Sequence, residues 1–235
     1  TEYLHFIPLI PRSVTAPVVR FLIRSFCNVL CDHVIVPTEK TKAVLRSEYG
    51  VTVPVDAIPT GVIEADVRRA SPEGIRERLQ VAPDTFLLLY VGRFSKEKNI
   101  YFLLRMLKRV LAIAPDRDIK LLLIARGPLE QEVKAYVRSE GLSGKVVFAG
   151  EVTRETIYNY YKVADLFVCA SKTETQGLVL SEAKACTLPA VAIDAAGVSE
   201  MVNHGRDGFL VPEDEELFAV HVLQLINAPE QLRQF

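Results

Sequence analysis

Short apolar runs alternate with helical patterns from Phe86 to the end of the chain. The first four runs are FLLLYV, IKLLLIA, KVVFAG and DLFVCA. Strands of a parallel sheet that is covered on both faces are typically continuous apolar runs, and helices usually connect them. Two further runs, PAVAID and GFLV, extend the pattern. It predicts an α/β fold with a Rossmann-like, doubly wound parallel sheet.

The part before Phe86 has a different organisation. It contains HVIVPT, a helical pattern over 39–49 and VDAIPTGV, which predict one more strand, helix and strand. A polar segment with Ser71, Pro72 and Gly74 follows and favours a hinge. We therefore expect the last portion of an N-terminal Rossmann-like domain at 1–64, a linker at 65–82 and a C-terminal domain at 83–235. Because the chain begins at Thr1, we expect an N-terminally truncated piece of a longer protein.

The composition and charge of the chain limit which classes of partner it could bind. The net charge is -1, which argues against a nucleic-acid binder with a broad basic face. The cysteines Cys27, Cys31, Cys169 and Cys186 lack paired metal-ligand spacing, so we expect free thiols in a reducing, cytoplasmic compartment. No apolar run approaches the roughly 20 residues needed to span a bilayer. A small-molecule partner is therefore expected.

The segment SKTETQGLVLSEAKA carries candidate chemistry. A helix that begins near Gly177 places Glu174 on the preceding loop and Glu182 about one and a half turns inside. Free N–H groups at a helix start attract phosphate, and carboxylates accept hydrogen bonds from vicinal hydroxyls. The arrangement predicts a site for a nucleotide diphosphate sugar. The alternative is a capped amphipathic helix with solvated acids.

A second segment, YVGRFSKEKNI, ends a predicted strand. Ligands of open parallel sheets bind at the carboxyl ends of strands, so Gly92, Arg93 and Lys98 arrive at the expected edge. Arg can grip a diphosphate through its planar fork, while Lys supplies a mobile charge. Ordinary surface charges are the alternative. The segment lacks the P-loop pattern, and IARGPLE lacks the spaced glycines of a dinucleotide site, which counts against a nicotinamide enzyme.

Four segments in order resemble the retaining glycosyltransferases of family four, which have the GT-B architecture. They lie between about Tyr90 and Val211 and read GRFSKEKN, ADLFVCASKTETQGLVLSEA, LPAVAIDAAGVSEMV and HGRDGFLV. The resemblance implies that Arg93 and Lys98 bind the diphosphate, Glu182 the ribose and Glu174 the hexose, without a metal or other cofactor. The implied catalytic residues are Glu174, Arg93 and Lys98. The implied donor-binding set is Gly92, Arg93, Lys98, Glu174, Thr175, Gln176, Gly177, Leu178 and Glu182.

The chain departs from the family pattern at two places, one of which is Ser181 or Lys184, where the family often has an apolar residue. Thr187 stands in KACTLP where the family often has glycine. Threonine loses freedom at positive φ, so we expect the turn after this helix to differ.

The head of the chain, TEYLHFIPLIP, together with ETQG and KEKN, looks like bacterial enzymes that glucosylate diacylglycerol. This resemblance implies retaining transfer of a hexose, with glucose and UDP-glucose expected, to a membrane lipid or another glycan acceptor. Backbone groups near Gly150 and Glu151 would read the base. We expect the fragment alone to be inactive. A sugar-nucleotide epimerase, a non-catalytic nucleotide-sugar binding module and a structural fragment without a ligand stay open as alternatives.

A helix predicted over 17–30 bears on the acceptor. Arg20, Arg24 and Asn28 form one polar stripe, and apolar residues cover the rest. Such a helix could lie at the inner membrane surface with its arginines at lipid phosphates, or it could be a core helix of the first domain. His5 and Tyr3 could line an acceptor cleft or be incidental.

Overall fold

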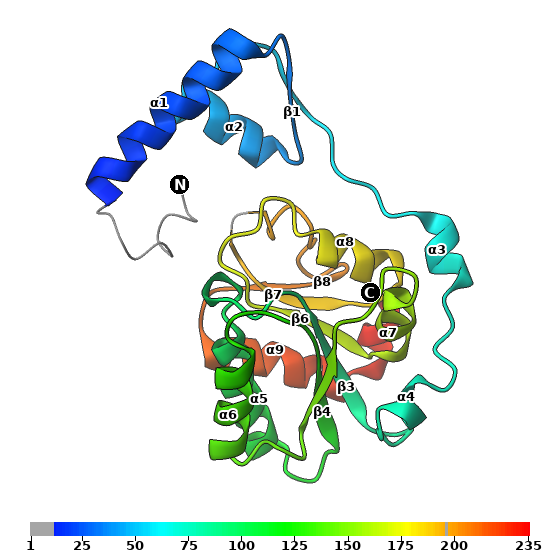
Figure 1. Cartoon of the computed structure of the whole chain (residues 1–235). Coiled ribbons are helices and arrows are strands. Elements are labelled where there is room, and N and C mark those ends of the chain that lie inside the picture. The colour runs from blue at the N-terminus through cyan, green and yellow to red at the C-terminus, as the bar shows by residue number, and fades with distance from the viewer. Residues whose placement is uncertain (1–11, 196) are drawn as a thin grey trace.

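A six-stranded parallel sheet forms the centre of the larger domain (Figure 1). The computed structural model describes residues 12–195 and 197–235, so Tyr3 and His5 lie outside the described residues. The strands are β3 (Phe86–Val91), β4 (Ile119–Ile124), β5 (Val146–Gly150), β6 (Leu166–Cys169), β7 (Ala190–Ile193) and β8 (Gly208–Val211). Their order is β5-β4-β3-β6-β7-β8, so the direction of winding reverses between β3 and β6. This order confirms the predicted doubly wound sheet.

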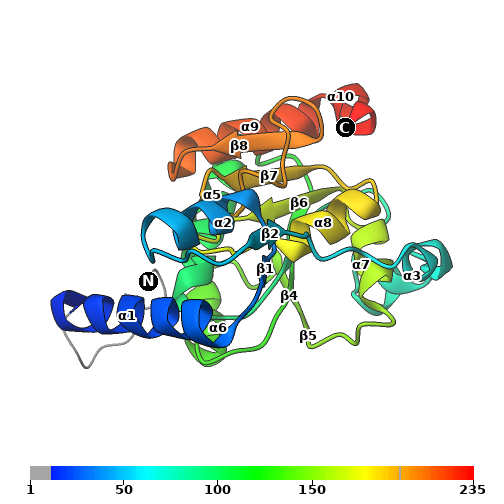
Figure 2. The same ribbon diagram turned by 90° about the horizontal axis from the view of Figure 1, so that it is seen from above.

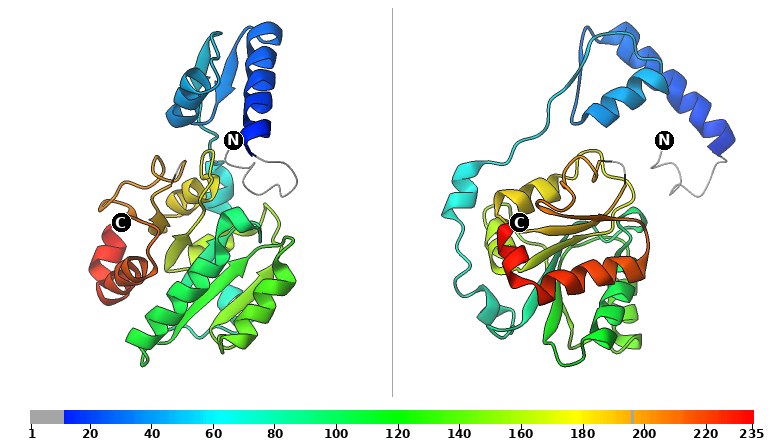
Figure 3. Two further views of the ribbon diagram at one scale, coloured as in Figure 1. Left: turned by 90° about the vertical axis from the view of Figure 1, so that its left-hand side faces the viewer. Right: turned by 180° about the vertical axis from the view of Figure 1, so that it is seen from behind.

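Helices cover both faces of this sheet, which explains why its strands are continuously apolar (Figure 3). On β3, Leu88 and Tyr90 face one core, and Leu87 and Leu89 face the other. The first core is completed by α5 (Ile100–Ile113), α6 (Glu130–Ser139), α9 (Glu215–Asn227) and α10 (Pro229–Gln234). The second is completed by α7 (Ile157–Val163) and α8 (Leu178–Ala185).

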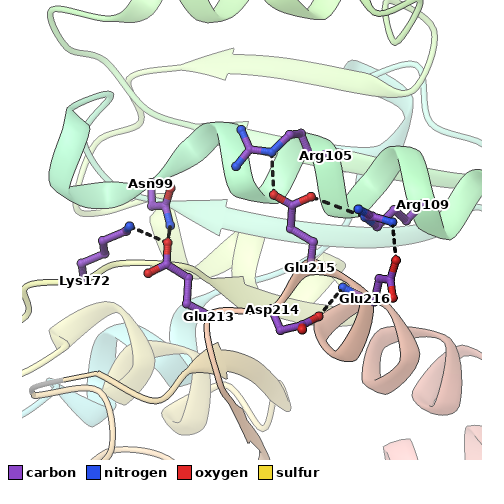
Figure 4. A network of polar contacts seen from close by, with 8 residues as sticks. All are labelled: Asn99, Arg105, Arg109, Lys172, Glu213, Asp214, Glu215 and Glu216. Atoms are coloured by element: carbon purple, nitrogen blue, oxygen red, sulfur yellow. Dashed lines mark hydrogen bonds and ion pairs between the residues drawn. The ribbon is translucent and has the colours of Figure 1, made fainter.

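The basic face of α5 pairs with the start of α9 (Figure 4). Glu215 accepts hydrogen bonds from Arg105 Nε at 2.6 Å and Arg109 Nε at 3.4 Å, and Glu216 accepts one from Arg109 at 2.9 Å. Asp214 caps α9 by accepting from the backbone N–H of Glu216 at 2.8 Å. Both arginines are exposed, and their ion pairs connect the two helices.

The N-terminal part is a small unit with its own core. It contains α1 (Arg12–Leu30), β1 (Val34–Val36), α2 (Glu39–Ser47) and β2 (Val55–Ala57), and the two strands pair in parallel. Cys27, Val36, Tyr49, Val51 and Val55 form the core. The unit contacts the larger domain beyond the carboxyl ends of the strands of the six-stranded sheet. There, Thr38 Oγ1 donates to the carbonyl of Thr175 at 3.3 Å.

Two residues of the polar stripe of α1 contact the rest of the N-terminal unit. Arg20 lies 3.7 Å from the Glu48 carboxylate, and Asn28 donates to the carbonyl of Gly50 at 3.1 Å. Arg20 and Arg24 are nevertheless exposed, so the expected placement of these arginines at lipid phosphates stays a prediction. The apolar side chains also face outward, between 54% and 77% exposed, on a helix that extends past the larger domain (Figure 2). They are Val18, Phe21, Leu22, Phe26, Val29 and Leu30.

The expected linker is packed along the larger domain. It contains α3 (Glu64–Arg69) and α4 (Ile75–Arg78), and Val67, Ile75 and Val81 are buried in the second core. The Arg76 guanidinium donates to the Asp165 carboxylate at 3.0 Å and to the carbonyl of Thr85 at 2.7 Å. Bending within 65–82 would break these contacts. The assignment of 65–82 as a hinge stays a prediction.

Thr187 adopts the left-handed conformation that glycine would favour, with φ of 55°. This conformation strains a β-branched residue. The expected difference of the turn after α8 from the family pattern stays a prediction. Relief of this strain, less the entropy cost of glycine, predicts that Thr187→Gly raises the free energy of unfolding by about 1 kcal/mol. Chemical denaturation measures it. Thr187→Ala keeps the Cβ and serves as control. Equal stabilisation by both variants would contradict the strain.

Candidate active site

A cavity of about 580 Å³ opens where β3, β4 and β5 end. Its size is typical of small-molecule sites. The start of α8, the start of α7 and the connection around Gly61 complete its wall. The lining residues are Thr60, Gly61, Val62, Val91, Gly92, Arg93, Ile124, Ala125, Arg126, Gly150, Glu151, Val152, Arg154, Ile157, Tyr158, Leu178 and Glu182. Four members of the predicted donor-binding set are among them: Gly92, Arg93, Leu178 and Glu182.

The loop after β3 is shaped by a buried tyrosine. The hydroxyl of Tyr90 donates to the carbonyl of Arg93 at 3.1 Å. A Cβ at Gly92 would stand 2.7 Å from that hydroxyl, so only glycine leaves room for it. Burial keeps the pKa of Tyr90 well above its usual value, so the hydroxyl remains a donor. The exposed Arg93 makes no ion pair with another residue that the structure describes.

Lys98 and Glu174 bind each other. Lys98 ends a short 3-10 turn, η2 (Lys96–Lys98), and its Nζ donates to Glu174 Oε1 at 2.5 Å. The two side chains are 20% and 13% exposed. The structure thus brings two predicted catalytic residues together, but neither lines the cavity that contains Arg93.

A further carboxylate holds these two loops. Glu213 accepts a hydrogen bond from Asn99 Nδ2 at 3.2 Å and pairs with Lys172 (Figure 4). Asn99 follows Lys98 in the chain, and Lys172 lies on the loop that leads to Glu174. Glu213 therefore ties the turn with the candidate ammonium to the loop with the candidate carboxylate.

The loop before α8 needs two glycines. Gly177 lies just before the helix with φ of 71°, which confirms the predicted helix start. A Cβ at Gly197 would stand 2.0 Å from the carbonyl oxygen of Glu174, so a side chain there would displace this loop. The first N–H groups of α8 have no partner within the helix, and Leu178 lines the cavity.

The two polar residues of this loop contact the N-terminal part of the chain. The buried Gln176 side chain donates to the carbonyl of Thr60 at 2.9 Å and accepts from its N–H at 3.1 Å. The carbonyl of Thr175 accepts from Thr38. The predicted diphosphate contact is made by backbone N–H groups of this loop. The contacts above involve the Gln176 side chain and the Thr175 carbonyl instead, so the diphosphate contact stays a prediction. No sequence pattern indicated the Gln176 bridge.

Glu182 lies on α8 and faces the cavity. Its Oε2 accepts a hydrogen bond from the Tyr161 hydroxyl at 2.8 Å. Burial raises the pKa of Glu182, while the Tyr161 hydrogen bond and the charge of Arg154 partly oppose the shift. A partly buried carboxylate with a raised pKa in a cavity is typical of a functional group.

This raised pKa predicts a cost to folding. We expect Glu182→Gln to raise the melting temperature at neutral pH, since the neutral amide avoids the desolvation of a charge. The gain should shrink as the pH falls through the raised pKa and vanish below the ordinary glutamate pKa, where the carboxyl is protonated in both states. Thermal unfolding across this range measures it. The same substitution at the exposed Glu132 should change little, and a gain that persists in acid would contradict the argument.

Sequence reasoning missed four cavity residues that carry polar side chains: Thr60, Arg126, Arg154 and Tyr158. Arg126 follows β4 as Arg93 follows β3, so its place at a strand end was a usable signal. Its Nε lies 3.6 Å from Glu151 Oε2, at the end of β5. Gly150 and Glu151 line the cavity, where a base could be read, and that role stays a prediction.

Metal ligands, membrane-spanning helices and cysteine pairing bear on the class of protein. Within 12–195 and 197–235, no group of three His, Cys, Asp or Glu could hold a metal ion. In the same residues, no helix is long and apolar enough to cross a membrane. All four cysteines are unpaired, and three of them are buried while Cys31 is partly exposed. The expectation of a metal-free site stays a prediction.

The sheet order and the second domain at the carboxyl ends of the strands define the GT-B fold. The family model described as glycosyl transferases group 1 matches residues 85–228. The chain belongs to this family.

Three known proteins illustrate the similarity. An alpha-monoglucosyldiacylglycerol synthase of Streptococcus pneumoniae is 28% identical over 97% of this chain and 52% of its own length. A D-inositol 3-phosphate glycosyltransferase 2 of Catenulispora acidiphila is 31% identical over 87% of this chain and 50% of its own length. The structure of Anabaena Alr3699/HepE with UDP and glucose has a TM-score of 0.79 at 21% identity, covering 92% of this chain and 59% of that one. The chain thus spans about half the length of these relatives.

Proposed function

We propose that the intact protein transfers a hexose from a nucleotide diphosphate sugar to an acceptor with retention of the anomeric configuration. One observation carries the proposal: Arg93, which has no ion pair within the described part of the chain, and the partly buried carboxylate of Glu182 face one cavity at the carboxyl edge of the sheet. Guanidinium suits a diphosphate, and a carboxylate suits sugar hydroxyls. We infer UDP-glucose as the donor, supported by the UDP and glucose named for the structural neighbour.

Departure of the diphosphate is the step that this site would assist. Arg93, Lys98 and the N-terminus of α8 would stabilise the charge that develops on the leaving group, and Glu174 would contact the hexose. The ion pair between Lys98 and Glu174 is compatible with both roles. Lys98 has three N–H donors and Glu174 a second oxygen, so each keeps hydrogen-bonding capacity for the donor.

We infer a membrane lipid of the diacylglycerol type as the acceptor, with a glycan as the alternative. The support is the name of one relative, a monoglucosyldiacylglycerol synthase. The protein would then act on the cytoplasmic side, at the inner membrane surface. Transfer would require the intact protein, because the chain spans about half the relatives' length and the acceptor would bind to the N-terminal half.

A calorimetric titration of this chain with UDP, GDP and ADP tests the donor. Selective binding of UDP supports the proposal, and binding of none of the three would contradict it. Assays of the intact protein then separate the enzymes. Glucosylation of diacylglycerol supports a transferase, sugar interconversion without an acceptor identifies an epimerase, and binding without turnover identifies a non-catalytic module. Transfer by the 235-residue chain alone would overturn its expected inactivity.

We also propose that the outward face of α1 contacts the bilayer through its apolar side chains. Phe21 is 68% exposed, and burying such a side chain is worth about 1.5 to 3 kcal/mol, or roughly ten-fold or more in binding. Phe21→Ser should therefore reduce co-sedimentation of the intact protein with phosphatidylglycerol vesicles by that factor. Ile113→Ser, at an equally exposed position on α5, is the control. If another part of a longer chain covers α1, neither variant will matter, and the proposal fails.

A further inference from the structure

Tyr161 connects the core of the larger domain to the candidate site. It is fully buried on α7, where its ring packs against Phe167 at 5.7 Å and Tyr158 at 6.2 Å between centroids. Its hydroxyl donates to Glu182 Oε2 at 2.8 Å. This is the one hydrogen bond of the Glu182 side chain among the residues that the structure describes. A rigid core group thus orients a carboxylate that faces the cavity.

The chemistry of the pair favours this arrangement. A glutamate side chain has several freely rotating bonds, and holding it in one rotamer costs conformational entropy when a ligand binds. A hydrogen bond from a fixed ring holds the side chain in one rotamer before binding, so the ligand does not have to bear this entropy cost. Burial holds the pKa of Tyr161 well above its usual value, so the hydroxyl keeps its proton. One carboxylate oxygen is then held, and the other remains an acceptor.

We propose that Tyr161 is a positioning residue that holds the Glu182 carboxylate for the vicinal hydroxyls of the donor's ribose and so sets the preference for ribonucleotides over 2′-deoxyribonucleotides. The inference rests on the proposed function, because it requires a nucleotide in the cavity. Tyr161 itself does not line the cavity, so its effect on the ligand passes through Glu182.

The same geometry predicts a pH signature. The groups that face Glu182 are Tyr158 and Tyr161 on α7, Arg154 before α7 and Cys186 at the end of α8. Of these, the Tyr161 hydrogen bond and Arg154 lower the pKa of Glu182. Removing the hydroxyl raises that pKa further. The carboxylate acceptor is then lost at a higher pH than in the unaltered chain.

The test compares UDP with 2′-deoxy-UDP by calorimetry. In the unaltered chain, UDP should bind more tightly. Tyr161→Phe should weaken the binding of UDP roughly ten-fold and that of 2′-deoxy-UDP less, so that the preference for UDP becomes smaller. As the pH is lowered, the UDP affinity of this variant should begin to fall at a higher pH than that of the unaltered chain. The matched control is Tyr160→Phe on the same helix, whose hydroxyl bonds to Arg78 instead. It should leave both affinities unchanged.

The possible outcomes distinguish failure of the proposed function from failure of the inference about Tyr161. If the unaltered chain binds no nucleotide, the proposed function and this inference both fail. If it binds UDP and Tyr161→Phe behaves like Tyr160→Phe, only the inference fails. In a Glu182→Ala background, Tyr161→Phe should add no further loss, and an undiminished loss would show a merely structural role. If Tyr161→Phe does not fold, proton NMR of the unaltered chain tests the hydrogen bond between Tyr161 and Glu182 instead. A slowly exchanging tyrosine hydroxyl that Glu182→Ala removes supports the inference, and its absence overturns it.

Discussion

Alanine in place of Arg93 is expected to weaken the binding of UDP roughly ten-fold to more than a hundred-fold, since a charged hydrogen-bond partner contributes about 1.5 to 3 kcal/mol. Arg93 follows β3 in the chain and lines the cavity, and its guanidinium has no ion pair with another described residue. It therefore carries an uncompensated charge at the place where a diphosphate would arrive. Isothermal titration calorimetry of this chain with UDP measures the loss.

Two further substitutions sharpen this test. Arg93→Lys keeps the charge but loses the planar fork, so its affinity should fall between those of the unaltered chain and the alanine variant. Arg138→Ala removes an exposed arginine of α6, away from the cavity, and should leave the affinity unchanged. Equal effects at Arg93 and Arg138 would mean that Arg93 contributes only to the overall charge, and the assigned role would be wrong.

Alanine in place of Phe218 is expected to lower the free energy of unfolding by about 3 to 5 kcal/mol. The side chain lies on α9 and is fully buried. Its ring packs edge to face against Phe102 of α5, with centroids 5.4 Å apart. The substitution leaves a cavity between the two helices that the surrounding close packing cannot fill. Urea denaturation followed by circular dichroism measures the change.

The control for this prediction lies on the same helix. Val220 is 52% exposed, so Val220→Ala should change the unfolding free energy by no more than about 0.5 kcal/mol. A loss of less than about 1 kcal/mol at Phe218 would show that α9 is not part of the cooperative core. That result would contradict the described packing of α9 on α5.

The sheet and its helices could be predicted because their signals are local. A strand buried on both faces must be apolar throughout, as FLLLYV is, and the apolar face of α5 repeats at the helical period. Gly177 could be recognised as the helix start for the same reason. The orientation of α1 could not be predicted in the same way, because apolar residues occupy most of its circumference. Periodicity alone then does not tell which face turns inward.

The contacts of the site depend on pairs that are distant in the chain. Lys98 and Glu174 were both predicted, but their ion pair requires the turn after β3 to lie beside the loop after β6. The hydrogen bond from Tyr161 to Glu182 requires two helices to meet at a particular register. The sheet order brings these partners together. A single sequence has no local pattern from which such pairs follow.

The packing of the connection between the two parts determines where the protein can bend. Arg76 and the buried Val67 and Ile75 fasten the later residues of the connection to the larger domain. A rotation of the N-terminal part would then be absorbed between β2 and α3, in the stretch that contains Thr60 and Gly61 of the cavity wall. The pivot and the wall are therefore the same stretch of backbone. Any tilt of one part against the other would change the width of the cavity directly, without a separate lid.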